Sequence, residues 1–83
     1  MNIYVSNIPF KMRDNELKEL FETQGEVITA RIIKDRETKR SRGFGFVEMP
    51  DDVAVQAIEN MNGKEVMGLA LRVSEAKSNG NKE

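Results

Sequence analysis

The chain has 83 residues, enough for one small domain with a single hydrophobic core. It contains neither Cys nor His, which excludes disulfide bonds and metal sites built from thiolate or imidazole ligands. Thirteen basic and fourteen acidic residues give a net charge of -1, which by itself argues against a strong nucleic-acid binder.

The charges are distributed unevenly along the chain. Residues 31–42 contain six basic and two acidic side chains, which leaves a local charge of +4. Acidic residues gather instead within residues 14–26 and 51–59. Two interpretations stay open: ordinary surface scatter, or a basic rim beside the aromatic face of the third predicted strand, described below, with these acids on the far side. We favour the second.

Membrane insertion and secretion are not indicated. No apolar run approaches the roughly 20 residues that a membrane-spanning helix needs. The first predicted strand begins almost at Met1, which leaves no room for a secretory or transit segment. We therefore expect a soluble, cytoplasmic protein.

The first predicted element is a strand at residues 2–6. In it Ile3 and Val5 alternate with Tyr4 and Ser6. Because successive side chains of a strand point to opposite faces, the two aliphatic residues are expected to face the core. Tyr4 is then expected on the outer face.

A helix is predicted at residues 14–24. Its buried stripe consists of Leu17, Leu20 and Phe21. Asp14 is an acceptable N-cap or first-turn acid, and Gly25 is expected to end the helix in the C′ position. We expect Phe10, in the preceding loop, and Phe21 to lie in the core.

The second strand is predicted at residues 27–34, with Ala30 and Ile32 facing the helices and Arg31 and Ile33 on the open side. Residues 35–41 form a polar, basic loop that joins it to the next strand as a hairpin. This loop is either a solvated connector or a phosphate-binding segment.

The third strand, at residues 42–49, has two different faces. Phe44, Phe46 and Glu48 point one way, and the small or aliphatic residues between them point the other way. Two large rings beside a charge are unusual on a core face. We therefore expect this aromatic face to be exposed to solvent and used in binding.

A second helix is predicted at residues 52–61, followed by a turn or minor hairpin at 64–68 and a last strand at 69–76. The helix buries Ala54, Ala57, Ile58 and Met61. In the last strand Leu71 and Val73 are expected inside, and Arg72, Ser74 and Ala76 outside. The domain is expected to cover residues 1–77, and residues 78–83 to form a disordered tail.

The predicted order is strand-helix-strand-strand-helix-strand. It is typical of an α+β, ferredoxin-like βαββαβ sandwich. In this architecture two helices cover one face of a four-stranded antiparallel sheet, and the other face stays open.

Two short motifs resemble those of the RNA recognition motif family. Residues 42–49 fit the family octamer, Lys/Arg-Gly-aromatic-Gly/Ala-aromatic-Val-x-aromatic, at every position except Met49. Residues 3–8 are similar to its companion hexamer, at the usual spacing of roughly 40 residues. The resemblance covers about residues 2–77. By parity Met49 faces inward, where a flexible thioether can fill the space, so no stacking surface is lost.

The resemblance implies a spatial strand order of fourth, first, third, second, with Tyr4 beside Phe44 and Phe46. It further implies that Tyr4 and Phe44 stack on bases, that Phe46 inserts near a sugar or between two bases, and that Arg42 pairs with a phosphate. The other expected RNA contacts are Arg31, Ile33, Arg40, Arg72, Ser74 and Lys77.

The implied partner is single-stranded RNA, with single-stranded DNA as a further possibility. We expect a monomer without metal or cofactor, acting in post-transcriptional regulation or as an RNA chaperone. The chain is similar to short, one-module bacterial RNA-binding proteins, although it lacks the glycine-rich tail of some of them. Since Ser6, Ser41 and Ser74 have no His to activate them, no enzyme is expected. The alternative is a domain of the same fold that binds a peptide.

Overall fold

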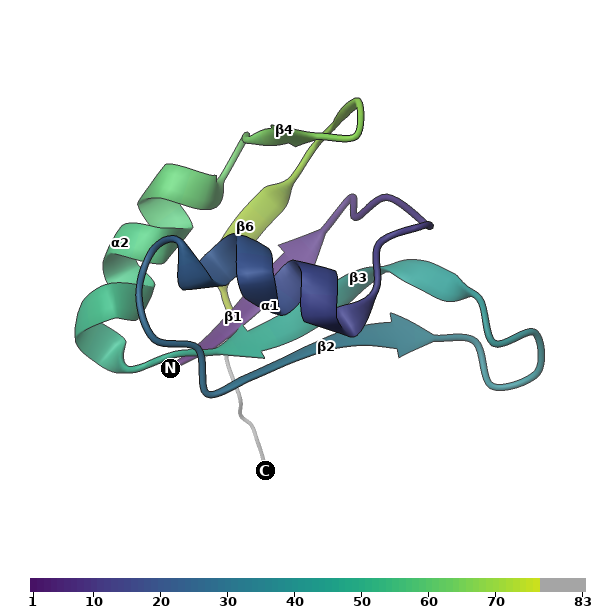
Figure 1. Cartoon of the computed structure of the whole chain (residues 1–83), viewed down its shortest axis with the longest axis horizontal. Coiled ribbons are helices and arrows are strands. Elements are labelled where there is room, and N and C mark those ends of the chain that lie inside the picture. The colour runs from purple at the N-terminus through teal and green to yellow at the C-terminus, as the bar shows by residue number, and fades with distance from the viewer. Residues whose placement is uncertain (77–83) are drawn as a thin grey trace.

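Two layers, a sheet and a pair of helices, make up the computed structural model, which describes residues 1–76 (Figure 1). The elements in chain order are β1 (Asn2–Ser6), α1 (Asp14–Glu22), β2 (Thr29–Lys34), β3 (Ser41–Glu48), α2 (Asp51–Met61), β4 (Glu65–Val66), β5 (Leu69–Ala70) and β6 (Arg72–Glu75). The domain boundary expected at Lys77 and the tail expected at residues 78–83 lie outside the described residues.

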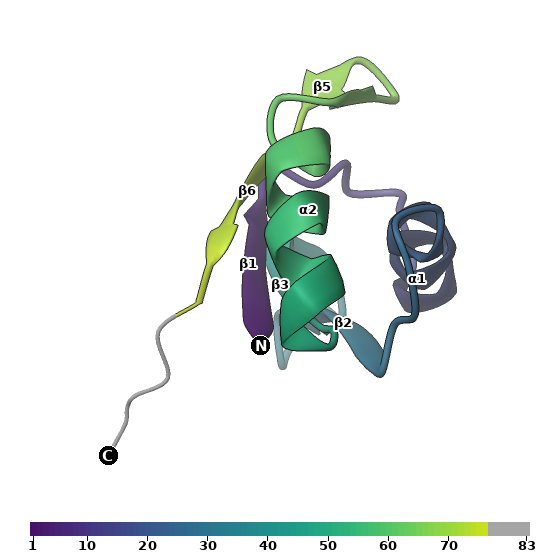
Figure 2. The ribbon, with the colours of Figure 1, turned by 90° about the vertical axis from the view of Figure 1, so that its left-hand side faces the viewer.

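The main sheet is antiparallel, with the strand order β2-β3-β1-β6. Both helices lie on the same side of it, and the other side carries no further layer in the described part of the chain (Figure 2). The predicted α+β ferredoxin-like class is therefore confirmed, with the strand order that the family resemblance implied. Neither of these helices is long and apolar enough to cross a bilayer.

The core lies between the inner face of the sheet and the apolar stripes of the two helices. Its fully buried side chains include Ile3, Val5, Leu17, Phe21, Val47, Met49, Ala54, Ala57, Met61 and Leu71. The alternation in β1 and β3 thus places aliphatic residues inward, as predicted. Met49 also lies inside, as parity predicted for the position where the octamer departs from its pattern.

Phe10 is exposed, and its prediction as a core residue is wrong. Its side chain is 76% exposed, whereas Phe21 is fully buried. The reason is a turn in which the backbone N–H of Met12 donates to the carbonyl of Pro9 at 3.0 Å. Pro9 and Met12 are buried at the two ends of this turn, so Phe10 between them faces solvent.

Helix α1 begins at Asp14, as predicted, but the hydrogen bond at its start is made by Arg13 and Glu16 and not by the Asp14 side chain. Asp14 is its first residue, and the backbone N–H of the preceding Arg13 donates to Glu16 Oε1 at 2.9 Å. Asp14 Oδ1 instead accepts a hydrogen bond from the backbone N–H of Ile32, also at 2.9 Å. This bond satisfies a donor on the outer edge of β2 and ties the helix to the edge strand.

Gly25 does not occupy the C′ position predicted for it. The helix ends at Glu22 with Thr23 as the C-cap, so Gly25 lies two residues further on. A Cβ at Gly25 would lie 2.9 Å from Val53 Cγ1 of α2. The glycine is therefore needed for the close approach of this loop to the second helix.

The last predicted strand is divided in two. Leu69 and Ala70 pair with Val66 and Glu65 in the small β4–β5 hairpin, and only β6 joins the main sheet. Leu71 separates the two segments and is buried, as predicted. The second strand begins at Thr29, two residues later than predicted.

A β-bulge interrupts the pairing of β2 with β3. Ile32 pairs with Gly45 and Lys34 pairs with Ser41, so one residue of β2 opposes three residues of β3. Within the bulge Gly43 has a φ of +83°, a conformation that favours glycine. Its carbonyl accepts a hydrogen bond from the backbone N–H of Ile8 at 2.8 Å, which attaches the β1–α1 loop to the bulge.

Asp35 organises the loop between β2 and β3. Its Oδ1 accepts hydrogen bonds from the backbone N–H groups of Glu37 at 2.8 Å and Thr38 at 3.1 Å. The N–H of Thr38, then that of Glu37 and the charge of Arg42 lower the pKa of Asp35 below its usual 3.8. The ionised carboxylate thereby stabilises the turn at Glu37 and Thr38.

Replacing Gly45 by Ala should destabilise the fold by about 1–3 kcal/mol, because a Cβ there would overlap the carbonyl oxygen of Arg31 and lie 2.9 Å from Ile32 Cα. Urea unfolding measures the change. The matched variant Ser74→Ala, on the exposed face of β6, should stay within about 0.5 kcal/mol of the wild type. A Gly45→Ala protein as stable as the wild type would contradict the close approach of the two backbones.

The amide chemical shifts of Glu37 and Thr38 should report the ionisation of Asp35. The pKa of Asp35 is lowered in the folded state. The ionised carboxylate therefore contributes its full stabilisation of the folded state above the ordinary pKa of 3.8, and this stabilisation is lost only as the pH falls through the lowered pKa. An NMR titration should therefore give a midpoint below 3.8 for both amides. A midpoint at or above 3.8 would show that these hydrogen bonds are not formed in solution.

Candidate nucleic-acid interface

Three aromatic rings lie together on the open face of the sheet. They come from Tyr4 of β1 and from Phe44 and Phe46 of β3, two strands that are neighbours at the sheet centre. The ring centroid of Tyr4 lies 5.9 Å from that of Phe44 and 5.6 Å from that of Phe46, and the two Phe centroids are 6.4 Å apart. The adjacency that the resemblance implied is thus confirmed.

The rings are held in place but remain accessible. Tyr4 and Phe44 are half-buried, and Phe46 is 39% exposed. Tyr4 is tilted by 41° and 54° against its two neighbours, and Phe44 meets Phe46 edge-on at 90°. Such tilted and edge-to-face contacts are favourable between aromatic side chains. Mutual packing therefore fixes the rings while part of their surface faces solvent. We call these three residues the aromatic triad.

The pairing register extends the aromatic triad into a row across the sheet. Arg31 of β2 is opposite Phe46, Phe46 is opposite Tyr4, and Tyr4 is opposite Ser74 of β6. Paired residues share a face, so all four side chains project to the open side. The arginine and the serine, both exposed, supply hydrogen-bond donors at the two ends of the row.

The other predicted site residues lie around this row, with one exception. Arg72 is exposed and pairs with Ser6, and Ile33 is half-buried beside the bulge. Arg40 and Arg42 are exposed at the hairpin end of the sheet. Lys77 lies outside the described residues.

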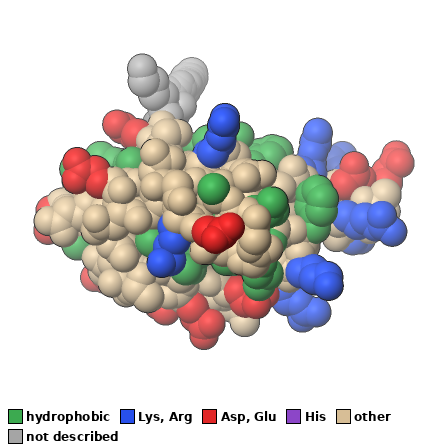
Figure 3. Space-filling view, turned by 90° about the horizontal axis from the view of Figure 1, so that it is seen from above, with side chains coloured by type: hydrophobic (Ala, Val, Ile, Leu, Met, Phe, Trp, Pro, Cys, Tyr) green, Lys and Arg blue, Asp and Glu red, His purple; other side chains and the backbone are tan. Residues whose placement is uncertain are grey.

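Charge is arranged along the strands, with a basic end and an acidic end. The basic end is the β2–β3 hairpin, where Figure 3 shows Lys and Arg side chains gathered at the right-hand side of the molecule. They are Lys34, Arg36, Lys39, Arg40 and Arg42. At the other end Glu48 shares the face of Phe44 and Phe46. Glu48 thus lies on the aromatic face, as the alternation in this strand predicted, and Asp35 and Glu37 lie within the basic hairpin.

No carboxylate of the described residues lies within ion-pair distance of the basic side chains of the hairpin. Within residues 1–76 the only ion pair joins the Met1 ammonium group to Asp51 at 3.0 Å. Surface cations without intramolecular partners can contact an external anion without first breaking an ion pair. These cations are therefore available for phosphate groups.

Phe10 is a candidate site residue that the sequence pattern did not indicate. Its exposed ring lies beside Gly43, because its Cε1 would be 3.6 Å from a Cβ at that glycine. The signal in the sequence was a large apolar residue between Pro9 and Lys11, in a loop without helical or strand periodicity. No group of three His, Cys, Asp or Glu residues that could hold a metal is found in the part of the chain that the structure describes.

The sequence is similar to two curated eukaryotic proteins. It is 42% identical over 83 residues to the human cleavage stimulation factor subunit 2 tau variant, covering 99% of this chain and 14% of that protein. It is 46% identical over 78 residues to glycine-rich RNA-binding protein 8 of Arabidopsis thaliana, covering 93% of this chain and 46% of that protein. The chain thus spans less than half of either relative. Neither of them supports the expected similarity to bacterial proteins.

Solved structures share the fold over nearly the whole chain. RNA binding protein PG1 is 48% identical, with a TM-score of 0.90 and coverage of 95% of this chain and 96% of that chain. The Sxl-lethal protein/RNA complex is 36% identical, with a TM-score of 0.89 and coverage of 95% and 48%. The family model of the RNA recognition motif matches residues 3–72. This chain belongs to the RNA recognition motif family.

Proposed function

We propose that this chain binds single-stranded RNA on the open face of its sheet, by stacking bases on the aromatic triad. The observation that carries the proposal is the grouping of these three rings, with centroids 5.6–6.4 Å apart, on a face that no helix covers. Unpaired bases present flat faces, and each base stacked on an aromatic side chain contributes roughly 1–3 kcal/mol. A double helix hides those faces, so the single-stranded form is the ligand.

The geometry suits a division of roles among the three rings. Tyr4 and Phe44 provide the two main stacking platforms. Phe46 is the more exposed of the two Phe rings and stands edge-on to Phe44, so it projects between bases or against a sugar. Gly45 lies between the two Phe residues in β3. Because it has no side chain, the backbone of β3 can approach the backbone of β2 closely at this position.

Polar and basic residues around the aromatic triad position the strand. Arg42 and Arg40 at the hairpin end contact phosphates, since neither is engaged with a carboxylate among the described residues. Arg31, Arg72 and Ser74 project from the same face and reach base edges or sugars, and Ile33 adds apolar contact. Lys77 is proposed to add a contact beyond the last described strand.

Two of the similar proteins support this proposal by their names, since one is an RNA-binding protein and another is a protein/RNA complex. We further propose binding without catalysis, by a cytoplasmic monomer whose domain covers residues 1–77. Its roles would be post-transcriptional regulation or RNA chaperoning. The absence of His and Cys from the sequence removes the commonest general base and the commonest thiol nucleophile.

Replacing Phe44 or Phe46 by Ala should weaken the binding of random-sequence single-stranded RNA by roughly five- to one-hundred-fold, because each change removes a stacking surface. Backbone amide shifts followed by NMR measure the affinity and locate the ligand. Val55→Ala is the matched control, since Val55 is 51% exposed on α2, behind the sheet. Shift changes confined to α1 and α2 would reject RNA binding by the sheet and would favour the peptide-binding alternative.

The salt dependence should be shallow. For a single strand, the slope of log K against log[salt] is about -0.7 for each phosphate that is neutralised. About three to five phosphates neutralised by the hairpin arginines and lysines predict a slope on the order of -2 to -3.5. Fluorescence anisotropy at several salt concentrations measures it, and a slope much steeper than about -6 would show that this small basic end is not the main electrostatic contact.

A further inference from the structure

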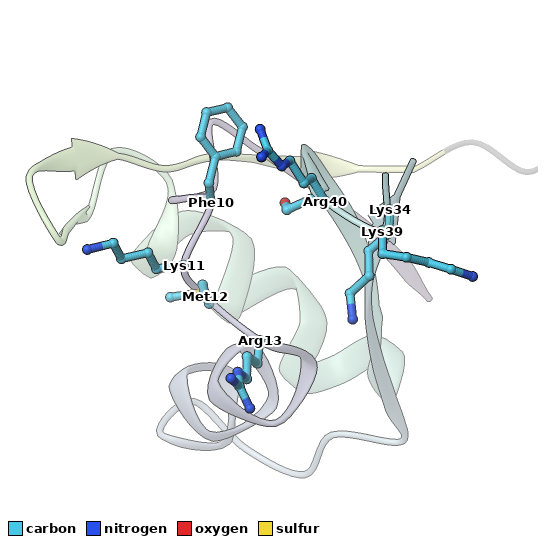
Figure 4. Close-up of a pocket in the computed structure, with 8 residues that line it drawn as sticks. Phe10, Lys11, Met12, Arg13, Lys34, Lys39 and Arg40 are labelled. Atoms are coloured by element: carbon cyan, nitrogen blue, oxygen red, sulfur yellow. The ribbon is translucent and has the colours of Figure 1, made fainter. Parts of the chain in front are cut away.

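A groove lies between the β1–α1 loop and the β2–β3 hairpin, outside the aromatic triad. Its volume is about 950 Å³, within the range of ligand-binding pockets. Figure 4 shows the ring of Phe10 at its mouth. The basic residues that line it are Lys11, Arg13, Lys34, Lys39 and Arg40. The groove thus combines one aromatic face with several cations.

Phe10 is held in its exposed position by the backbone on both sides. The N–H of Ile8 donates to the carbonyl of Gly43 at 2.8 Å, and the N–H of Met12 donates to the carbonyl of Pro9 at 3.0 Å. Ile8 and Met12 are both buried, so the loop cannot turn Phe10 inward without removing a core residue. The ring is therefore fixed outward, where an unpaired planar ligand can reach it.

The groove lies next to β3, the strand that carries Phe44 and Phe46, because Ser41 at the start of β3 lines it. Phe10 Cε1 would lie 3.6 Å from a Cβ placed on Gly43, and Gly43 directly precedes Phe44 in β3. The Cα atoms of Gly43 and Phe44 are about 3.8 Å apart, as in any pair of neighbouring residues. The ring of Phe10 therefore lies beside the residue that precedes the stacking residue Phe44.

The charge of the groove favours a nucleotide over other planar ligands. Five of its lining residues are cationic and none is a carboxylate. Asp35, next to the lining residue Lys34, directs its Oδ1 to the N–H groups of Glu37 and Thr38. Figure 4 shows the Arg40 side chain extending toward the Phe10 ring, while Lys11 extends away from it on the other side. A nucleotide supplies both a flat base and a phosphate, whereas an acidic peptide supplies only the anions.

We propose that this groove binds one further nucleotide of the same RNA strand, with its base against Phe10 and its phosphate among the groove cations. The inference rests on the proposed function and extends the binding surface beyond the sheet. Arg40 then contacts RNA from within the groove.

The test compares two random-sequence RNA pools, of three and of eight nucleotides, on the wild type and on Phe10→Ala. The aromatics of the sheet in this family hold two or three bases, so the short pool occupies the sheet and only the long pool also fills the groove. Phe10→Ala should weaken the long pool by roughly five- to one-hundred-fold and leave the short pool unchanged. Val55→Ala should change neither, and thermal unfolding should show that Phe10→Ala is folded, since the ring is largely exposed.

Two results would overturn the inference while leaving sheet binding intact. If Phe10→Ala weakens neither pool, the groove does not bind RNA. If it weakens both pools equally, Phe10 supports the aromatic triad and does not form a separate nucleotide site. Phe44→Ala distinguishes loss of binding at the sheet from loss of binding at the groove, because it should weaken the binding of both pools. If wild-type protein binds neither pool, the proposed function fails first.

A charge variant gives an independent readout of the same groove. Replacing Lys39 and Arg40 together by Gln should make the slope of log K against log[salt] for the long pool shallower, by about 0.7 for each phosphate that is no longer neutralised. Lys18→Gln, on the exposed side of α1, is the control and should leave the slope unchanged. An unchanged slope in the double variant would show that no phosphate lies in the groove.

Discussion

The antiparallel pairing of β1 with β3 is the constraint on which the rest of the structure depends. It sets Ile3 opposite Val47 and Tyr4 opposite Phe46. The first pair is buried beneath the helices and the second stands on the open face. A shift of one residue in this register would move every side chain to the other face and abolish both the core and the aromatic triad together. Stability and binding are therefore tied to the same set of backbone hydrogen bonds.

The hairpin that follows β2 adds a second, electrostatic element. A bulge with a positive φ at Gly43 turns the start of β3, and Asp35 holds the connecting loop through two backbone N–H groups. The loop carries several cations that have no carboxylate partner in residues 1–76. Glu48 marks the opposite end of the aromatic face. The open face thus combines aromatic rings at its centre with cations at one end, and this arrangement gives the proposed binding surface a direction.

Alternation along the strands predicted most of the fold and the aromatic triad. Period-2 spacing in β1 and β3 separates aliphatic from aromatic side chains, and it correctly places even Met49, where the octamer departs from its pattern. The adjacency of the rings needed more, because spacing alone does not say which strands pair. That information came from the resemblance to the family, and the observed strand order confirms it.

The errors fell where a local pattern has several solutions. A loop has no periodicity, so the orientation of Phe10 depends on the turn between Pro9 and Met12, which the sequence does not reveal. Gly25 has the local pattern of a helix terminator, but its role is set by the distant Val53 of α2. The hydrogen bond of Asp14 to β2 is likewise a tertiary contact that joins residues 18 positions apart. In each case the deciding partner lies elsewhere in the chain.

Ultraviolet crosslinking of the protein to single-stranded RNA, with the modified residues identified by mass spectrometry, shows whether unpaired bases lie on the aromatic triad. Crosslinks are expected within β1 and β3, at Tyr4, Phe44 or Phe46. Crosslinks found only on α1 or α2 would contradict this expectation.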